Sequence, residues 1–373
     1  MRIAFDAKRL YNNFTGLGNY SRTLVSNLVF HFPENNYHLF SPKLKQNEET
    51  LPFLNHPKLN THLSSAWLKA YWRSFSIKED LRQKNIQIYH GLSHEIPFGI
   101  QKTGIKSVVT IHDLIIRRYP EYFPFLDRQI YNQKFRYACE QADRIIAISK
   151  NTKKDIINYY QIPASKIQVI YQTCHERFKQ IFPATHLEKI RLRYQLPNHF
   201  LLYVGSIIPR KHLKEIVEAV ALLPDDLQIP LVVVGDGKAY KKEVVERISS
   251  LQMTSKVYFL NPQYADLPAI YQLAQLFIYP SAYEGFGLPI LEALYAQTPV
   301  IAARTSSLPE AGGEGAYYVD EISAERLAAA ITLLLEREDA IKTLVRKGQQ
   351  HLSNFSSVVL SRQLMELYEA VMQ

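Results

Sequence analysis

Short apolar runs alternate with longer stretches of helical periodicity along the whole chain of 373 residues. A run of four to eight apolar residues, bounded by polar residues or glycine, is typical of a strand buried on both faces. The first half contains six candidate strands: Arg2–Phe5, Tyr37–Ser41, Ile88–His90, Ser107–His112, Ile145–Ser149 and Ile167–Tyr171. The second half contains five: Phe200–Gly205, Leu231–Gly235, Val257–Leu260, Leu276–Pro280 and Val300–Ala303.

Helical patterns fill the intervals, as over Tyr20–His31, Leu126–Ala142 and His212–Leu223. Alternation of strand and helix predicts parallel sheets that helices cover on both faces. Two such series meet near Gln172–Phe178, and the length also favours two domains. We therefore predict an α/β chain with two Rossmann-like domains that face a central cleft, where the carboxyl ends of the strands would bind ligands.

Composition changes this picture little. Apolar residues make up 47% of the chain and charged residues 21%, as in ordinary globular proteins. The two cysteines, Cys139 and Cys174, lack metal-ligand spacing and fit a reducing compartment. No signal-peptide core follows the N-terminus, and no apolar run has the 18 or so residues of a membrane span. We expect a cytoplasmic protein.

The charge is unevenly distributed. Residues 1–173 hold 24 Lys and Arg against 13 Asp and Glu, whereas residues 174–373 hold 20 against 22. A basic half attracts anionic partners, although scattered solubilising cations would give the same count. Because no nucleic-acid-binding pattern is found, we expect no nucleic acid partner.

Residues 279–292, Tyr-Pro-Ser-Ala-Tyr-Glu-Gly-Phe-Gly-Leu-Pro-Ile-Leu-Glu, are the most informative segment. A buried strand precedes them, and Pro289 suits the first turn of a helix over Pro289–Gln297. A glycine turn at a helix start exposes backbone N–H groups to a phosphate or sugar hydroxyl. Glu284 and Glu292 would bracket that site and accept hydrogen bonds from vicinal hydroxyls.

This Glu-(seven residues)-Glu segment, with its inner Gly-Phe-Gly-Leu-Pro, resembles the donor site of glycosyltransferase family 4, whose members are retaining enzymes of the GT-B fold. The resemblance implies that Glu292 binds the ribose. It implies that Glu284 binds the transferred sugar, assisted by the backbone of Gly285, Phe286, Gly287 and Leu288. It also implies that the last helix, Ser357–Met372, crosses back to the N-terminal domain.

Gly205–His212 closes the first strand of the second half and brings Arg210 and Lys211 to a helix start. The helix dipole disfavours a merely structural basic pair there. In the resembling enzymes this pair holds the donor diphosphate, and fixed cations would stabilise the charge that develops on it.

Other candidates are weaker. The Gly16 and Gly18 loop does not match a dinucleotide fingerprint, but the equivalent family loop reaches toward the diphosphate and acceptor. His112 ends a strand at the predicted cleft, where the family often has a His that hydrogen-bonds the sugar. Glu310 lies in a loop that resembles one flanking the donor.

Trp67, Tyr71 and Phe75 are spaced four apart, with cations between them. An amphipathic basic and aromatic helix binds anionic membrane surfaces, but the same pattern occurs in helices packed on a sheet. We keep peripheral attachment to the cytoplasmic membrane face as a hypothesis that the sequence leaves open.

Together these features predict a hexosyltransferase that moves mannose from GDP-mannose to a glycan or lipid-linked acceptor in cell-surface polysaccharide synthesis. Domain 1–172, with the crossing helix in 355–373, would bind the acceptor, and domain 173–354 the donor. We expect no metal, because no Asp-x-Asp motif is present, and no cofactor besides the donor substrate. Alternatives are a UDP-sugar glucosyl- or N-acetylglucosaminyltransferase, a nucleotide-sugar epimerase and a non-catalytic sugar-nucleotide binding module. The incomplete glycine loops disfavour a nicotinamide dehydrogenase.

Overall fold

The computed structural model describes residues 1–373, which form two compact α/β units. The N-terminal unit is Met1–Thr173 with Phe355–Gln373, and the C-terminal unit is Cys174–Asn354. The sequence prediction placed the boundary between residues 172 and 173.

A seven-stranded, all-parallel sheet forms the centre of the N-terminal unit, in the order β3-β2-β1-β4-β5-β6-β7. Its strands are β1 Arg2–Asp6, β2 Asn36–Ser41, β3 Leu59–Leu63, β4 Ile88–Gly91, β5 Lys106–Ile111, β6 Arg144–Ala147 and β7 Ile167–Val169. Its helices are α1 Lys8–Asn12, α2 Gly16–His31, α3 Leu51–Leu54, α4 Lys69–Tyr71, α5 Ile77–Gln83, α6 Ile115–Arg118, α7 Phe125–Gln141, α8 Lys150–Tyr160 and α17 Ser357–Met372.

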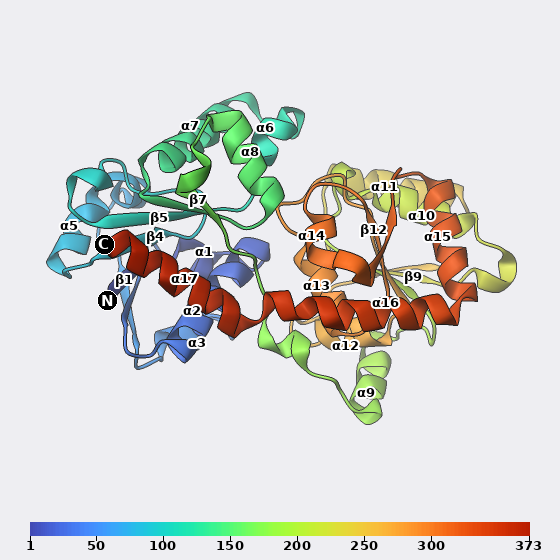
Figure 1. Cartoon of the computed structure of the whole chain (residues 1–373). Helices are drawn as coiled ribbons and strands as arrows, with labels where there is room; N and C mark the ends of the chain where they lie inside the picture. The colour runs from blue at the N-terminus through green and yellow to red at the C-terminus, as the bar shows by residue number, and fades with distance from the viewer. The chain divides into compact units, whose positions relative to one another are not determined.

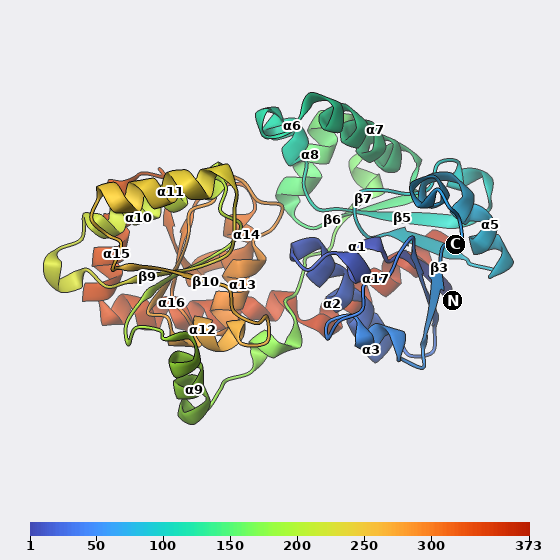
Figure 2. The same cartoon turned by 180° about the vertical axis from the view of Figure 1, so that it is seen from behind.

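Helices cover both faces of this sheet. One core contains buried residues of α5, α7 and α8 together with strand residues, among them Leu81, Cys139, Ile145 and Ile156. On the other face α17 packs against α2, as Figures 1 and 2 show. Tyr368 of α17 is fully buried, so the predicted last helix does belong to the N-terminal unit.

The C-terminal unit has six parallel strands in the order β10-β9-β8-β11-β12-β13. They are β8 Leu201–Val204, β9 Leu231–Val234, β10 Val257–Leu260, β11 Leu276–Tyr279, β12 Val300–Ala303 and β13 Ala316–Val319. The helices are α9 Ala184–Tyr194, α10 Leu213–Ala221, α11 Ala239–Ser250, α12 Leu267–Leu273, α13 Leu288–Tyr295, α14 Leu308–Gly312, α15 Ala324–Glu336 and α16 Glu338–His351.

The predicted α/β class and parallel sheets are confirmed, and all predicted strands are present with ends shifted by a few residues. Two strands escaped the prediction. β3 lies at a sheet edge and carries Asn60 and His62, so it lacks the apolar run of a buried strand. β13, also an edge strand, has only two buried positions. Sparse burial of this kind leaves a weak sequence signal.

The helix predicted from Tyr20 in fact begins at Gly16, so Gly16 and Gly18 lie in the first turn of α2 and not in a loop before it.

No helix of the structure is both long enough and apolar enough to cross a bilayer.

Candidate active site

The segment that carries the paired glutamates forms a strand, a tight loop and a helix in the C-terminal unit. β11 ends at Tyr279, and α13 begins at Leu288 with Pro289 in its first turn. Gly287 precedes the helix with a φ of 121°, a conformation that other residues rarely adopt. A Cβ at this position would also lie 3.0 Å from Leu308 of α14. Glycine therefore permits both the turn and the close packing of α14.

Arg210 and Lys211 contact Glu284 at one edge of the sheet of the C-terminal unit, beyond the ends of β8 and β11. The two cations lie in a single 3₁₀ turn, Pro209–Lys211, that precedes α10. Arg210 Nη1 is 2.7 Å from Glu284 Oε1, and Lys211 Nζ also forms an ion pair with this oxygen. Ser281 Oγ donates a hydrogen bond of 2.6 Å to the same atom. Two cations and one carboxylate leave one net positive charge in the cluster.

Electrostatics keeps the carboxylate of Glu284 ionised. Burial would raise the pKa of Glu284, but Lys211 and Arg210, with hydrogen bonds from Lys211 and Ser281, lower it to about 2. Burial also lowers the pKa of Lys211, and Glu284 opposes that effect. The ammonium of Lys211 lies 4.4 Å from the ring centre of Tyr279 and bonds the hydroxyl of that residue. The cations are thus held in fixed positions before any ligand binds.

The loop between β12 and α14 supports the glutamate loop from the side. Thr305 Oγ1 donates to the carbonyl of Ser281 at 2.7 Å. The backbone N–H of Glu284 donates to Ser306 Oγ at 2.9 Å. Ser307 Oγ lies 2.8 Å from the carbonyls of both Glu284 and Phe286. These hydroxyls fix the backbone from which Glu284 projects, and the sequence prediction did not assign them this role.

Glu292 has a different environment, although it belongs to the same motif. It lies in α13 and is buried, with 8% of the residue exposed. Tyr271 donates a hydrogen bond of 2.9 Å to Glu292 Oε2. Burial raises the pKa of Glu292 to about 7, and the Tyr271 hydrogen bond only partly opposes the shift. One carboxylate of the motif is therefore fixed as an anion, while the other titrates near neutral pH.

The other predicted donor-site residues lie around this cluster. The side chain of Phe286 is buried in the core, so only its backbone can contact a donor. Gly285 precedes Phe286 in the loop, and Leu288 is the first residue of α13. Gly205 follows β8, and its carbonyl oxygen would lie 1.9 Å from a Cβ on Gly235. The glycine at position 235 thus lets the two neighbouring strand ends approach each other.

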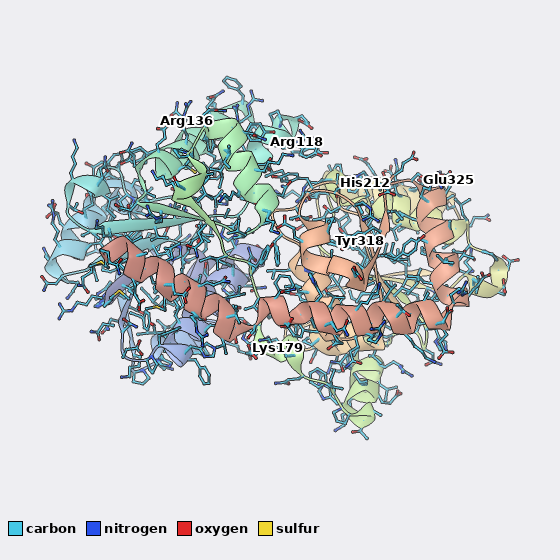
Figure 3. The ribbon with its side chains drawn as sticks, viewed as in Figure 1. Arg118, Arg136, Lys179, His212, Tyr318 and Glu325 are labelled. Carbon is cyan, nitrogen blue, oxygen red and sulfur yellow. The ribbon has the colours of Figure 1, made fainter.

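Glu310 lies in α14, which packs against α13, and its carbonyl oxygen accepts a hydrogen bond from His351 at 3.0 Å. His212, labelled in Figure 3, ends the turn that carries the two cations and pairs with Glu215 at 3.0 Å. Donor contacts by Glu310 stay a prediction.

Gly16 and Gly18 differ in their surroundings. A Cβ on Gly18 would lie 1.7 Å from the carbonyl oxygen of Asn13, whereas a Cβ on Gly16 would meet nothing within 4 Å. The close approach of Asn13 thus explains why Gly18 is glycine. Nothing in the N-terminal unit explains Gly16 in this way.

His112 follows β5 and is buried, with 4% of the residue exposed. One ring nitrogen, Nε2, lies 2.8 Å from the carbonyl of Leu92, and Nδ1 lies 3.3 Å from Gln172 Nε2. Burial and the neighbouring His94 lower its pKa to about 3, so the ring is neutral. Because both nitrogens have protein partners, a sugar hydrogen bond requires Gln172 to give way, and it stays a prediction.

The cluster around Arg210 can bind a dianionic group, and Glu292 can accept hydrogen bonds from neighbouring hydroxyls. The sequence prediction named these charged residues. It missed Tyr271, Tyr279 and Ser281, which tune or orient them. Ser281 could have been noticed, because it lies in the motif itself, but Tyr271 is distant in sequence and signals nothing alone.

Two family models match the chain. The model described as Glycosyltransferase Family 4 matches residues 16–174, and the model described as Glycosyl transferases group 1 matches residues 186–351. These ranges divide where the two units divide. The cluster of Arg210, Lys211 and Glu284, together with Glu292, lies in the second range, whereas Gly16, Gly18 and His112 lie in the first.

Relatives agree with the models. The O-antigen chain mannosyltransferase B of Escherichia coli is 28% identical, over 99% of this chain and 100% of its own length. The serotype-specific mannosyltransferase WbdA of Escherichia coli is 32% identical, but the match covers 60% of this chain and 28% of the relative. The O-antigen chain mannosyltransferase RfbU of Salmonella typhimurium is 24% identical, over 74% of this chain and 72% of its own length.

Solved structures share the fold. A glycosyltransferase from Rickettsia africae superposes with a TM-score of 0.77 at 18% identity, covering 100% of this chain and 98% of its own. Anabaena HepE, crystallised with UDP-glucose, gives a TM-score of 0.76 at 18% identity, covering 99% of this chain and 100% of its own. The chain therefore has the GT-B glycosyltransferase fold.

Proposed function

Because the chain belongs to family 4 of the glycosyltransferases and carries the group 1 domain, we propose that it is a retaining hexosyltransferase. It moves mannose from GDP-mannose to a hydroxyl of a glycan or lipid-linked acceptor in cell-surface polysaccharide synthesis. The observation that carries this proposal is the preformed cluster of Arg210, Lys211 and Glu284 beside the start of α13.

The cluster suits the diphosphate of a nucleotide sugar. Its single net positive charge complements an anion, and the carboxylate of Glu284 keeps both cations in place. As the bond to the sugar breaks, negative charge develops on the leaving phosphate. Cations that are already oriented and partly buried stabilise this charge more than water does. The start of α13 adds partial positive charge from its backbone N–H groups.

Glu284 and Glu292 then divide the hydroxyl contacts. All three contacts described for the Glu284 carboxylate use Oε1, so Oε2 would accept a hydroxyl of the transferred sugar. Glu292, as an anion, would accept both ribose hydroxyls while Tyr271 fixes its orientation. Hydrogen bonds from the ribose hydroxyls would offset part of the burial penalty of the Glu292 anion, and donor binding would thus favour release of its proton.

For the retaining step we favour attack on the face that the diphosphate leaves, within a close ion pair. The acceptor hydroxyl forms the new bond to the anomeric carbon, the bond to the diphosphate breaks, and the leaving phosphate takes the hydroxyl proton. Covalent attack by Glu284 is the less favoured variant, because the ion pairs with Arg210 and Lys211 stabilise the negative charge of its carboxylate and make it a weaker nucleophile. We propose that no metal takes part, since side chains and a helix terminus supply positive charge at the diphosphate.

The choice of mannose follows the O-antigen mannosyltransferase relatives, of which one spans the whole chain. A UDP-sugar donor is the second candidate, because HepE, with the same fold, was crystallised with UDP-glucose. A non-catalytic sugar-nucleotide binding module would have the same cluster, so only a measurement of turnover distinguishes it from an enzyme.

Thermal-shift measurements with GDP-mannose, UDP-glucose, UDP-N-acetylglucosamine and GDP-fucose test the donor. A ligand that binds only the folded state raises the melting temperature by mass action. We expect a shift with GDP-mannose that Arg210→Ala and Glu292→Ala both abolish. A shift with the UDP-sugars alone would mean that the donor is a UDP-sugar and not GDP-mannose. No shift with any of the four nucleotide sugars would contradict the proposal. Turnover that persists in EDTA is expected, and loss of turnover would contradict the metal-free mechanism.

A further inference from the structure

His94 is buried in the N-terminal unit beside His112, and it belongs to none of the sequence motifs described above. We propose, on the basis of the function proposed above, that His94 is a further catalytic residue whose ring donates a hydrogen bond to a hydroxyl oxygen of the transferred sugar. Three features of His94 support this role: its backbone conformation, its unpartnered ring nitrogens and the rings that surround it.

The backbone of His94 is left-handed, with a φ of 63°. Eight residues other than glycine have a positive φ in this chain. Five of them follow the ends of α-helices, where this conformation is usual: Asn85, Gln161, Gln195, Gln252 and Gln297. The other three are His94, His212 and Ser306. His212 ends the turn that carries the two cations, and Ser306 accepts the backbone N–H of Glu284. Because strain of this kind collects at functional sites, the same conformation at His94 points to a function.

The loop after β4 fixes this conformation. The backbone N–H of His94 donates to a carbonyl of β5 at 2.9 Å. A Cβ on Gly91, the last residue of β4, would lie 2.0 Å from the carbonyl oxygen of Glu95, so the loop folds back tightly on its own strand. The carbonyl of Leu92 in the same loop accepts a hydrogen bond from His112 Nε2 at 2.8 Å. The loop therefore holds His94 and His112 in a fixed relation to each other.

The ring nitrogens of His94 have no hydrogen-bond partner in the protein. Nδ1 is enclosed without a partner, and no hydrogen bond joins Nε2 to another residue. The residue is 7% exposed, and since Nδ1 is enclosed, Nε2 is the nitrogen that reaches the surface. A buried polar group without a partner is rare and costs free energy, which a phenylalanine ring would avoid. The presence of these nitrogens therefore indicates a role in binding.

Aromatic rings hold the imidazole of His94 in place. It stacks on Phe135 of α7 with 4.3 Å between ring centres and 15° between ring planes, and its centre lies 5.2 Å from that of His112. Burial lowers the pKa of His94 to about 3, so the ring is neutral and carries one proton. Because a buried N–H without a partner is tolerated less well than a bare acceptor, we place this proton on Nε2.

A neutral N–H donor suits a sugar hydroxyl. The hydroxyl oxygen accepts from Nε2, while its own proton stays free for another partner. The carboxylate of Glu95 acts on the ring more strongly than the cation of Arg9 does, which disfavours an anion. The neighbouring His112 is the residue for which the family resemblance implies a contact with the transferred sugar. A hydrogen bond from His94 to the same sugar would fix its orientation while the bond to the diphosphate breaks.

Release of GDP from GDP-mannose by the full chain, measured with and without mannotriose, tests this role. His94→Phe keeps an aromatic ring against Phe135 and removes both nitrogens, so kcat should fall about tenfold in both assays, the factor for one lost hydrogen bond. His94→Asn adopts a positive φ readily, but its amide ends near the position of Nδ1, so it should lose as much. His94→Gln places an amide N–H near the position of Nε2 and should recover most of the loss.

His38→Phe is the matched control, because it makes the same substitution in the same unit. His38 lies on β2, where it pairs with His62 at 2.9 Å, and its replacement should leave kcat unchanged. The thermal shift with GDP, which lacks the sugar, should be equal in wild type and in all four variants, which shows that each variant folds.

An unchanged kcat in His94→Phe and His94→Asn overturns the inference. So does a His94→Gln variant that is as impaired as His94→Phe, because the N–H would then have no part in the effect. A loss that is confined to the assay with mannotriose would assign His94 to the acceptor and overturn the contact with the transferred sugar. A wild type that releases no GDP removes the proposed function and this inference with it, whereas an active wild type with unimpaired His94 variants removes this inference alone.

Discussion

Glu292→Gln should make the protein more stable at neutral pH while it weakens donor binding. Glu292 is buried with one hydrogen bond, from Tyr271, and burial raises its pKa to about 7 from the ordinary value of 4.5. The folded state therefore binds this proton more tightly than the unfolded state does. As the pH rises from about 4.5 to about 7, the unfolded chain ionises first, and the free energy of unfolding falls.

The size of the effect follows from this difference in pKa. Each tenfold change in proton affinity is worth about 1.4 kcal/mol, so the wild type loses about 3 kcal/mol across this pH interval. Glutamine has nearly the same shape, can accept the Tyr271 hydrogen bond and does not ionise. The stability advantage of the variant over wild type should thus grow by about 2.5 kcal/mol between pH 5 and pH 8, since the unfolded chain is already partly ionised at pH 5.

The assay is urea unfolding followed by circular dichroism at several pH values, with GDP-mannose affinity measured on the same samples. Glu284→Gln is the matched control with the opposite sign. Lys211, Arg210 and hydrogen bonds overcome burial and lower the pKa of Glu284 to about 2, so its ionic contribution is present above about pH 4.5 and is lost toward pH 2. That variant should lose about 3 kcal/mol at every pH from 5 to 8.

A stability difference between Glu292→Gln and wild type that does not change between pH 5 and pH 8 would refute the reasoning. It would mean that water or movement of α13 already relieves the burial of this carboxylate.

Three further predictions test other parts of the structure. Gly18→Ala should destabilise the protein by about 2 kcal/mol or more, since its Cβ would overlap a backbone oxygen, whereas Gly16→Ala should leave the melting temperature unchanged or slightly higher; equal effects would contradict the packing described. Tyr271→Phe removes the hydrogen bond that lowers the pKa of Glu292, so the pH midpoint of GDP-mannose binding, followed by fluorescence or calorimetry, should move upward from about 7. A midpoint that falls contradicts this assignment. Arg210→Ala should reduce kcat/KM for GDP-mannose at least a hundredfold, and this factor should exceed the factor by which the variant weakens the affinity for GDP. An unchanged kcat would exclude a role of Arg210 in the transition state.

The α/β class and the charged residues of the donor site were predictable because their signals are local. Apolar runs mark the inner strands, and the glycines and proline between Glu284 and Glu292 report a strand, a turn and a helix start. The same locality explains the two missed edge strands, because no residue of β3 and only two residues of β13 are buried.

What the sequence could not predict depends on contacts between distant residues. Nothing near Glu292 indicates that Tyr271 fixes it or that its pKa is raised, and nothing near Glu284 indicates that the hydroxyls of residues 305–307 hold its loop. The segment around Phe75 was ambiguous in sequence between a membrane helix and a packed helix. In the structure Phe75 stacks on Phe98, while Trp67 is exposed. Membrane attachment itself stays a prediction.

Basic side chains elsewhere on the N-terminal unit, such as Arg118 and Arg136 on α6 and α7, extend into solvent and account for part of its positive charge (Figure 3). Since they are exposed, they affect the rate at which anionic partners approach more than the strength of any single contact.

The central claim is retaining transfer of mannose, and proton NMR of the reaction product tests it most directly. The chain is incubated with GDP-mannose and mannotriose, and the anomeric proton of the newly linked sugar is observed together with the release of GDP. The account predicts GDP release with an α-linked product, the same configuration as in the donor, and no release in Arg210→Ala. A β-linked product, or GDP-mannose that stays intact with mannotriose and with lipid-linked acceptors, would contradict it.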